Sequence, residues 1–82
     1  MSEFPLEDML RREPTLQEKL NEERIELSSK IQRLKTFITM DSKFKQLDYG
    51  HRRLLQDQLV SMNHYESVLV ERLMLLNQPN NN

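Results

Sequence analysis

Two charged residues interrupt an otherwise apolar stripe in the segment 15–40, and their side chains could bind a charged ligand. Alternating steps of three and four residues give this stripe as Leu20, Glu23, Leu27, Lys30, Leu34 and Phe37. Such spacing is typical of a helix that packs on another helix. A carboxylate or an ammonium placed there loses hydration unless a partner residue or a ligand compensates its charge. Because Glu23 and Lys30 are two turns apart, they do not pair with each other.

A second polar set interrupts the apolar residues of the segment 49–77. The side expected to face the first segment carries Gln58, Tyr65 and Arg72. The planar guanidinium of Arg72 suits phosphate oxygens or the face of a purine, and the phenol of Tyr65 can stack on a base. Arg33 lies one turn beyond Lys30 and adds a further cation. The candidate ligand-binding residues are therefore Glu23, Lys30, Arg33, Tyr65 and Arg72.

Each of these residues also has a purely structural interpretation. Lys30 can lay its stem on apolar surface and reach water, or it can fix the register or number of packed helices. Arg72 can pair with a glutamate across an interface, and Tyr65 can belong to the core. Gln58 can satisfy Lys30 or a backbone group rather than touch a ligand. The residue types alone leave both interpretations open.

Composition excludes several functional classes. The 82 residues include no cysteine, no glycine-rich phosphate loop and no nucleophile elbow, and His51 and His64 are too far apart to share a metal from one helix. We therefore expect no enzymatic activity, no metal and no cofactor. A net charge of −1 argues against binding to duplex nucleic acid, and no apolar run is long enough to span a membrane. The expected location is the cytoplasm.

Charge is distributed unevenly along the chain. Residues 1–26 have a net charge of −4, residues 30–53 a net charge of +5 and residues 54–82 a net charge of −2. A small rod with an acidic end and a basic end suits head-to-tail self-association or the capture of a small anion. The alternative is a solvated surface without a binding role.

The pattern predicts an all-α fold, in which a short N-terminal helix precedes an antiparallel hairpin of two helices. Thr15 and Glu18 form a capping box at the start of the first long helix. Asp41 or Ser42 can cap one helical turn in the connector, and Asp48 can cap the second long helix. The expected segments are a short helix over 1–13, a hairpin domain over 14–77 with helices over about 15–40 and 49–77 and a connector over 41–48, and a disordered tail over 78–82.

Antiparallel pairing about the connector predicts which residues meet. Glu23 is expected near Tyr65 or one turn beyond it, and Lys30 is expected near Gln58 and Met62. Phe44 and Leu47 are the two apolar anchors of the connector and are expected to close the end of the hairpin.

Residues 68–76 are apolar on more than one face of their helix. A helix of this kind is buried on more than one side, and a lone hairpin has no further element to cover it. A chain of 82 residues without disulfides or a structural metal also has a small core. We therefore expect a homo-oligomer.

The spacing of these residues resembles that of small helical-hairpin proteins of tailed bacteriophages, which carry a crAss-like-phage label. The matching pattern covers about residues 19–75 and consists of Glu23-Arg24-x-x-Leu27-x-x-Lys30-Ile31-x-x-Leu34-x-x-Phe37-Ile38, then Phe44-x-x-Leu47, then Leu54-Leu55-x-x-Gln58-x-x-x-Met62-x-x-Tyr65-x-x-x-Leu69-x-x-Arg72. It is similar to the anti-CBASS sponges, which bind cyclic dinucleotide and cyclic trinucleotide signals and withhold them from host effectors.

The resemblance implies a compact hexamer with nucleotide pockets between subunits. The sponges use a lysine of the first long helix at one kind of pocket and an arginine of the second helix at another, and Lys30 and Arg72 are the matching positions. They also use an N-terminal aromatic residue, which has no counterpart here because Thr15 and Leu16 occupy its place.

These observations lead us to expect a phage immune-evasion protein that binds and sequesters a cyclic oligonucleotide without cleaving it. It would act in the cytoplasm of the infected bacterial host. One alternative is a helical protein that binds and inhibits a host protein. Another is a structural coiled-coil adaptor, which would tolerate Lys30→Leu and become more stable with it.

Overall fold

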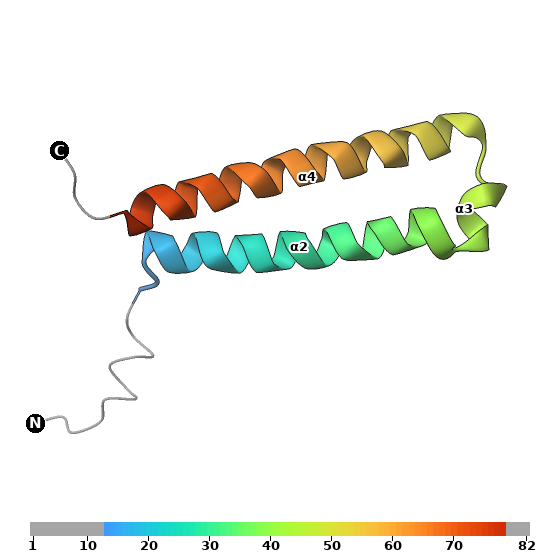
Figure 1. Ribbon diagram of the computed structural model, residues 1–82. Helices are drawn as coiled ribbons and strands as arrows, with labels where there is room; N and C mark the ends of the chain where they lie inside the picture. The colour runs from blue at the N-terminus through green and yellow to red at the C-terminus, as the bar shows by residue number, and fades with distance from the viewer. Residues whose placement is uncertain (1–12, 79–82) are drawn as a thin grey trace, which may run out of the picture.

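Three helices make up most of residues 13–78, which are the residues that the computed structural model describes. They are α2 (Leu16–Met40), α3 (Ser42–Gln46) and α4 (Tyr49–Asn77), and residues 13–78 contain no strand. The long helices α2 and α4 run antiparallel beside each other, and α3 joins them at one end of the hairpin (Figure 1). The described part of the chain is therefore all-α, as expected. The predicted helix over 1–13 and tail over 78–82 lie outside the described residues, apart from Glu13 and Gln78.

Side-chain caps fix the start of each helix locally. At α2, the Glu18 amide donates to Oγ1 of Thr15 at 3.1 Å, and the Thr15 amide donates to Oε1 of Glu18 at 2.8 Å, which completes the predicted capping box. Asp41 caps α3 by accepting from the Lys43 amide at 2.9 Å. Asp48 caps α4 by accepting from the His51 amide at 3.1 Å. These bonds satisfy amides that have no carbonyl partner in the first turn.

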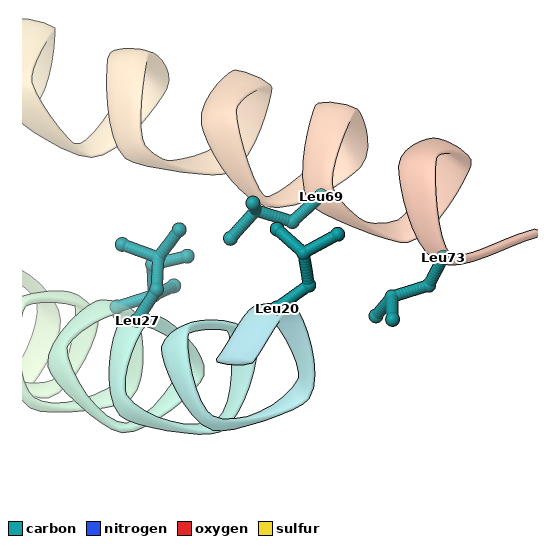
Figure 2. Packing of buried hydrophobic residues seen from close by; sticks show 5 residues of the cluster. Leu20, Leu27, Leu69 and Leu73 are labelled. Atoms are coloured by element: carbon teal, nitrogen blue, oxygen red, sulfur yellow. The ribbon is translucent and has the colours of Figure 1, made fainter. Parts of the chain in front are cut away.

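The core is a small leucine-rich cluster between the two long helices. Its buried members are Leu20, Leu27, Ile31, Leu69 and Leu73. Leu69 projects from α4 toward Leu20 on α2 (Figure 2) and is fully buried. Leu59 and Met62 pack against the cluster from α4 and extend it toward α3. Burial of these apolar side chains is the main force that holds α2 against α4.

Two phenylalanines close the end of the hairpin at α3. Phe44 is buried, and its ring lies edge-to-face on Phe37 of α2, with ring centroids 5.9 Å apart and an interplanar angle of 86°. This geometry is favourable because the positive edge of one ring meets the negative face of the other. The predicted role of Phe44 as an anchor of the connector is therefore confirmed.

The predicted seam differs from the buried face of each helix. Glu23 and Lys30 are exposed, and the buried place beside Lys30 belongs to Ile31. An α-helix turns about 100° per residue, so Lys30 lies about 60° away from Leu27 and outside the contact between helices. Buried or half-buried residues of α2 instead follow steps of four and three, at Leu20, Arg24, Leu27, Ile31 and Leu34. The stripe therefore has the expected period, but its intermediate positions lie one residue later than predicted.

The same shift of one residue occurs in α4. Leu54, Gln58 and Arg72 were expected to face α2, but all three are exposed. Leu59, which the sequence pattern did not single out, packs on the core instead. The charged residues of the seam therefore border the core on one side, and they are not buried in it.

Candidate ligand-binding flank

A hydrogen bond between Tyr65 and Glu23 joins α4 to α2 at the outer edge of the core. The Tyr65 hydroxyl donates to Oε2 of Glu23, and both side chains are exposed. This bond raises the pKa of the Tyr65 phenol, since ionisation would remove the donated proton. Desolvation and the negative charge of Glu23 act in the same direction, and the Arg72 guanidinium acts against them. The expected proximity of Glu23 and Tyr65 is confirmed.

This contact places the other candidate residues along one side of the hairpin, which we call the Tyr65 flank and define by Glu23, Lys30, Tyr65 and Arg72. Lys30 follows Glu23 by seven residues on α2, and Arg72 follows Tyr65 by seven residues on α4. Seven residues make nearly two full turns. Lys30 therefore lies on the same side of α2 as Glu23, and Arg72 lies on the same side of α4 as Tyr65. Because the helices are antiparallel, Lys30 lies toward α3 from the pair and Arg72 lies toward the open end of the hairpin.

The two cations of the Tyr65 flank are far apart. Each lies about 10 Å along the helix axis from the Glu23–Tyr65 pair, at a rise of about 1.5 Å per residue. Their separation along the hairpin is therefore about 20 Å, which is too long for one phosphate to touch both. Within a single chain, Lys30 and Arg72 thus belong to two separate positions rather than to one pocket.

None of the three candidate cations has a carboxylate partner within the part of the chain that the structure describes. Lys30, Arg33 and Arg72 are exposed, and the contacts between acidic and basic side chains of the described residues join Asp48 to His51 at 2.7 Å and Asp57 to Arg53 at 3.3 Å. Their charges are therefore available to an anion, whether it comes from a ligand or from a second chain.

Arg33 borders the Tyr65 flank and lines a separate open hollow of about 550 Å³ at the corner between α2 and α3. Three residues beyond Lys30 on the helix, its side chain is rotated by about 60° toward the outer face of α2. The hollow is lined by Arg33, Thr36, Phe37, Met40, Asp41 and Ser42. Lys30, Tyr65 and Arg72 are not part of it, so the structure does not gather all five candidate residues into one cavity.

The predicted contact between Lys30 and Gln58 is not found. The Gln58 amide Nε2 instead donates to Sδ of Met62, one turn along α4, at 3.8 Å. Sequence reasoning also passed over Arg52, a half-buried residue near the start of α4. Its Nε atom is buried and has no hydrogen-bond partner among the described residues. An arginine one turn from a helix N-cap carries no sequence pattern that marks it as partly buried.

Several large apolar side chains are exposed at the open end of the hairpin. On and beside the Tyr65 flank these are Leu16 at 52%, Val68 at 37%, Leu75 at 68% and Leu76 at 44% exposed. Val70 and Met74 are exposed on the other side of α4, at 39% and 58%. The C-terminal half of α4 therefore presents apolar surface on more than one face, as the sequence predicted. Apolar surface of this kind typically marks an interaction site.

The remaining polar groups form no recognisable catalytic or metal-binding arrangement within residues 13–78. His51 contacts the cap of α4 through Nδ1, which lies 2.7 Å from Oδ1 of Asp48. The two bonds from His51, the backbone one first, lower the pKa of the Asp48 carboxyl. No group of three or more histidine, cysteine or acidic residues in the described region could hold a metal ion. None of its helices combines the length and hydropathy of a membrane span.

Comparisons with known proteins place the chain in a family. Comparison with curated proteins and comparison with solved structures each gave no match. The family model of Sequestin matches residues 14–75, a range that includes the whole of α2 and α3 and nearly all of α4. The match also contains Glu23, Lys30, Arg33, Tyr65 and Arg72. The chain therefore belongs to the Sequestin family.

Proposed function

We propose that this protein binds cyclic di- or trinucleotide immune signals and sequesters them without cleavage. In this role it serves a phage against a cyclic-nucleotide defence in the cytoplasm of the infected bacterial host. The family name denotes a sequestering protein, which is compatible with such a role. The phage origin and the type of signal rest on the resemblance to anti-CBASS sponges over residues 19–75.

The observation that carries the proposal is the arrangement of the Tyr65 flank. An aromatic ring and a carboxylate lie at its centre, and an exposed cation without a carboxylate partner in the described residues lies on each side. A cyclic oligonucleotide offers phosphates to the cations and base faces to the ring. The described chain thus carries both kinds of group that such a ligand requires.

The separation of the cations favours binding between subunits. One phosphate cannot bridge the span of about 20 Å between Lys30 and Arg72, so each cation would need further groups from a second chain to enclose a ligand. The exposed apolar residues beside the Tyr65 flank, Val68 and Leu75 among them, are suited to hold that second chain. We therefore propose a homo-oligomer, a hexamer as the resemblance implies, in which ligand pockets lie between hairpins.

The proposal is tested by thermal shift and native mass spectrometry of the full chain with a panel of cyclic di- and trinucleotides. A ligand that binds only the folded state stabilises it by about 2.7 kcal/mol at a hundredfold excess over its dissociation constant. We expect a shift with at least one nucleotide and a stoichiometry tied to the oligomer. Recovery of the intact nucleotide after heat denaturation of the complex distinguishes sequestration from hydrolysis.

Two variants locate the site. Lys30→Ala and Arg72→Ala should each weaken binding of the ligand at the pocket that contains the replaced residue by at least about tenfold. Each variant removes a charge-assisted hydrogen bond to that ligand. The oligomer should persist in both variants. Lys35→Ala is the matched control on α2, because five residues rotate its exposed side chain by about 140° from Lys30. Arg53→Ala is the control on α4, because its guanidinium already pairs with Asp57.

A second function is favoured by the same exposed apolar residues of α4, which could bind a helix of a host protein. In that case no cyclic nucleotide would shift the melting temperature, and the alanine variants of Lys30 and Arg72 would behave like their controls. Capture of one defined host protein, lost when Met74 or Leu75 is replaced by a charged residue, would then replace the sequestration proposal.

A further inference from the structure

The charge order along the Tyr65 flank indicates how a ligand would lie on it. A carboxylate stands at the centre, and the two cations stand about 10 Å to either side. Phosphates are repelled by Glu23 and attracted by Lys30 and Arg72, so a phosphate of a ligand belongs at one end of the flank, beside Lys30 or beside Arg72. The centre is left to an uncharged group that can donate hydrogen bonds, which for a nucleotide is the edge of a base.

Glu23 has unused acceptor capacity at this central position. An ionised carboxylate has two oxygens and about four acceptor sites, and it donates nothing. Among the described residues, only the Tyr65 hydroxyl donates to Glu23, and it does so at Oε2. The second oxygen and the remaining exposed acceptor sites, which water can occupy, are therefore open to donors of a ligand.

The phenol ring beside this carboxylate is held in place. Its hydroxyl bond to Glu23 ties the tip of the Tyr65 side chain on α4 to α2. Its exposed ring therefore offers a stacking surface. Because the ring is already ordered in the free protein, ligand binding costs less side-chain conformational entropy. A base that stacks near Tyr65 would bring its hydrogen-bonding edge within reach of the neighbouring carboxylate.

We propose that Glu23 selects guanine among the bases of the cyclic oligonucleotide ligand, with Tyr65 as the residue that positions its carboxylate. This inference rests on the proposed function. The Watson–Crick edge of guanine presents two adjacent donors, the ring N1–H and the exocyclic N2 amine, which match the two oxygens of a carboxylate. Adenine presents one amine beside a ring nitrogen that accepts, so one carboxylate oxygen would face a second acceptor and remain unpaired.

The test compares cyclic di-GMP with cyclic di-AMP by isothermal titration calorimetry on the full-length chain. We expect the unmodified protein to bind cyclic di-GMP at least about tenfold more tightly, since one charge-assisted hydrogen bond separates the two bases. Glu23→Gln replaces one acceptor oxygen of the carboxylate by the NH2 group of an amide, which donates, and should remove this preference. Glu22→Gln is the matched control, because its exposed side chain is rotated by about 100° from Glu23 and should leave the preference unchanged.

Tyr65→Phe distinguishes the role of Glu23, which binds the guanine edge, from the role of Tyr65, which positions the Glu23 carboxylate. It keeps the stacking ring and the carboxylate but removes the bond between them, so the guanine preference should shrink without vanishing, and Glu23→Gln should still abolish it. Equal affinity of the unmodified protein for both nucleotides would overturn the selection of guanine and leave the sequestration proposal standing. A guanine preference that survives Glu23→Gln would likewise overturn the role of Glu23 and leave the sequestration proposal standing. Failure of every cyclic nucleotide to bind would overturn both proposals.

Discussion

Leu69 of α4 lies over Leu20 of α2 at the centre of the core, and no part of the Leu69 side chain is accessible to solvent (Figure 2). Leu69→Ala should therefore lower the free energy of unfolding by about 2–5 kcal/mol, through lost burial and the cavity that remains. Chemical denaturation followed by circular dichroism measures this change. Leu54→Ala is the matched control, because Leu54 is 57% exposed and should have a much smaller effect. Equal losses at both positions would contradict the packing of α4 on α2.

Because of the hydrogen bond between Tyr65 and Glu23, we expect the stability of the folded chain to fall at alkaline pH. The folded chain holds the phenol proton more tightly than the unfolded chain, whose tyrosine pKa is about 10. The stabilising effect is therefore complete below this pKa and is lost as pH rises through the higher pKa of the folded state. Spectrophotometric titration of the phenolate in a Tyr49→Phe background, where Tyr65 is the remaining tyrosine, measures the folded pKa directly.

Glu23→Gln serves as the control for this titration. It removes the carboxylate that raises the pKa of Tyr65 but leaves the nearby Arg72 guanidinium, which lowers it. The phenol should then titrate at a lower pH than in the parent protein. A Tyr65 pKa that does not respond to Glu23→Gln would show that the two side chains do not interact in solution.

Gly50 in the first turn of α4 is a site for stabilisation. A methyl group built at this position meets no atom within 4 Å, and the backbone does not have a positive φ angle. Gly50→Ala should therefore raise the free energy of unfolding by about 0.5–1 kcal/mol, because alanine loses less backbone entropy in a helix. The midpoint of denaturation measures the gain. A loss of stability would indicate that a second chain approaches α4 closely at Gly50.

The exposed apolar residues of α4 predict the effect of one added charge on assembly. Light scattering should give the unmodified protein a mass that is a multiple of its chain mass of 9.9 kDa. Leu75→Glu should shift the assembly toward single chains, because a carboxylate in an apolar interface loses its hydration without a partner. Ile25→Glu is the control, since Ile25 is also exposed, at 57%, but lies on the outer face of α2. A parent protein with the mass of one chain would contradict the proposed oligomer.

The boundaries of the helices were determined by the sequence itself, because they depend on contacts between residues close in the chain. Thr15 with Glu18, Asp41 and Asp48 each cap a helix within three residues, and such bonds form wherever the local chain is helical. The pairing of Glu23 with Tyr65 was also predictable, because a short connector between antiparallel helices leaves little freedom in their register.

Which side of each helix is buried was decided only by the tertiary structure. Lys30 and Ile31 are neighbours in sequence, and either could lie in an apolar stripe with steps of three and four. The structure buries Ile31 and exposes Lys30, because the rotation of α2 that best fills the space against Leu69 and Met62 places the longer charged side chain in water. As a result of this packing, Glu23 and Lys30 lie on the exposed Tyr65 flank, where a ligand can reach them, and not between the helices as the sequence pattern predicted.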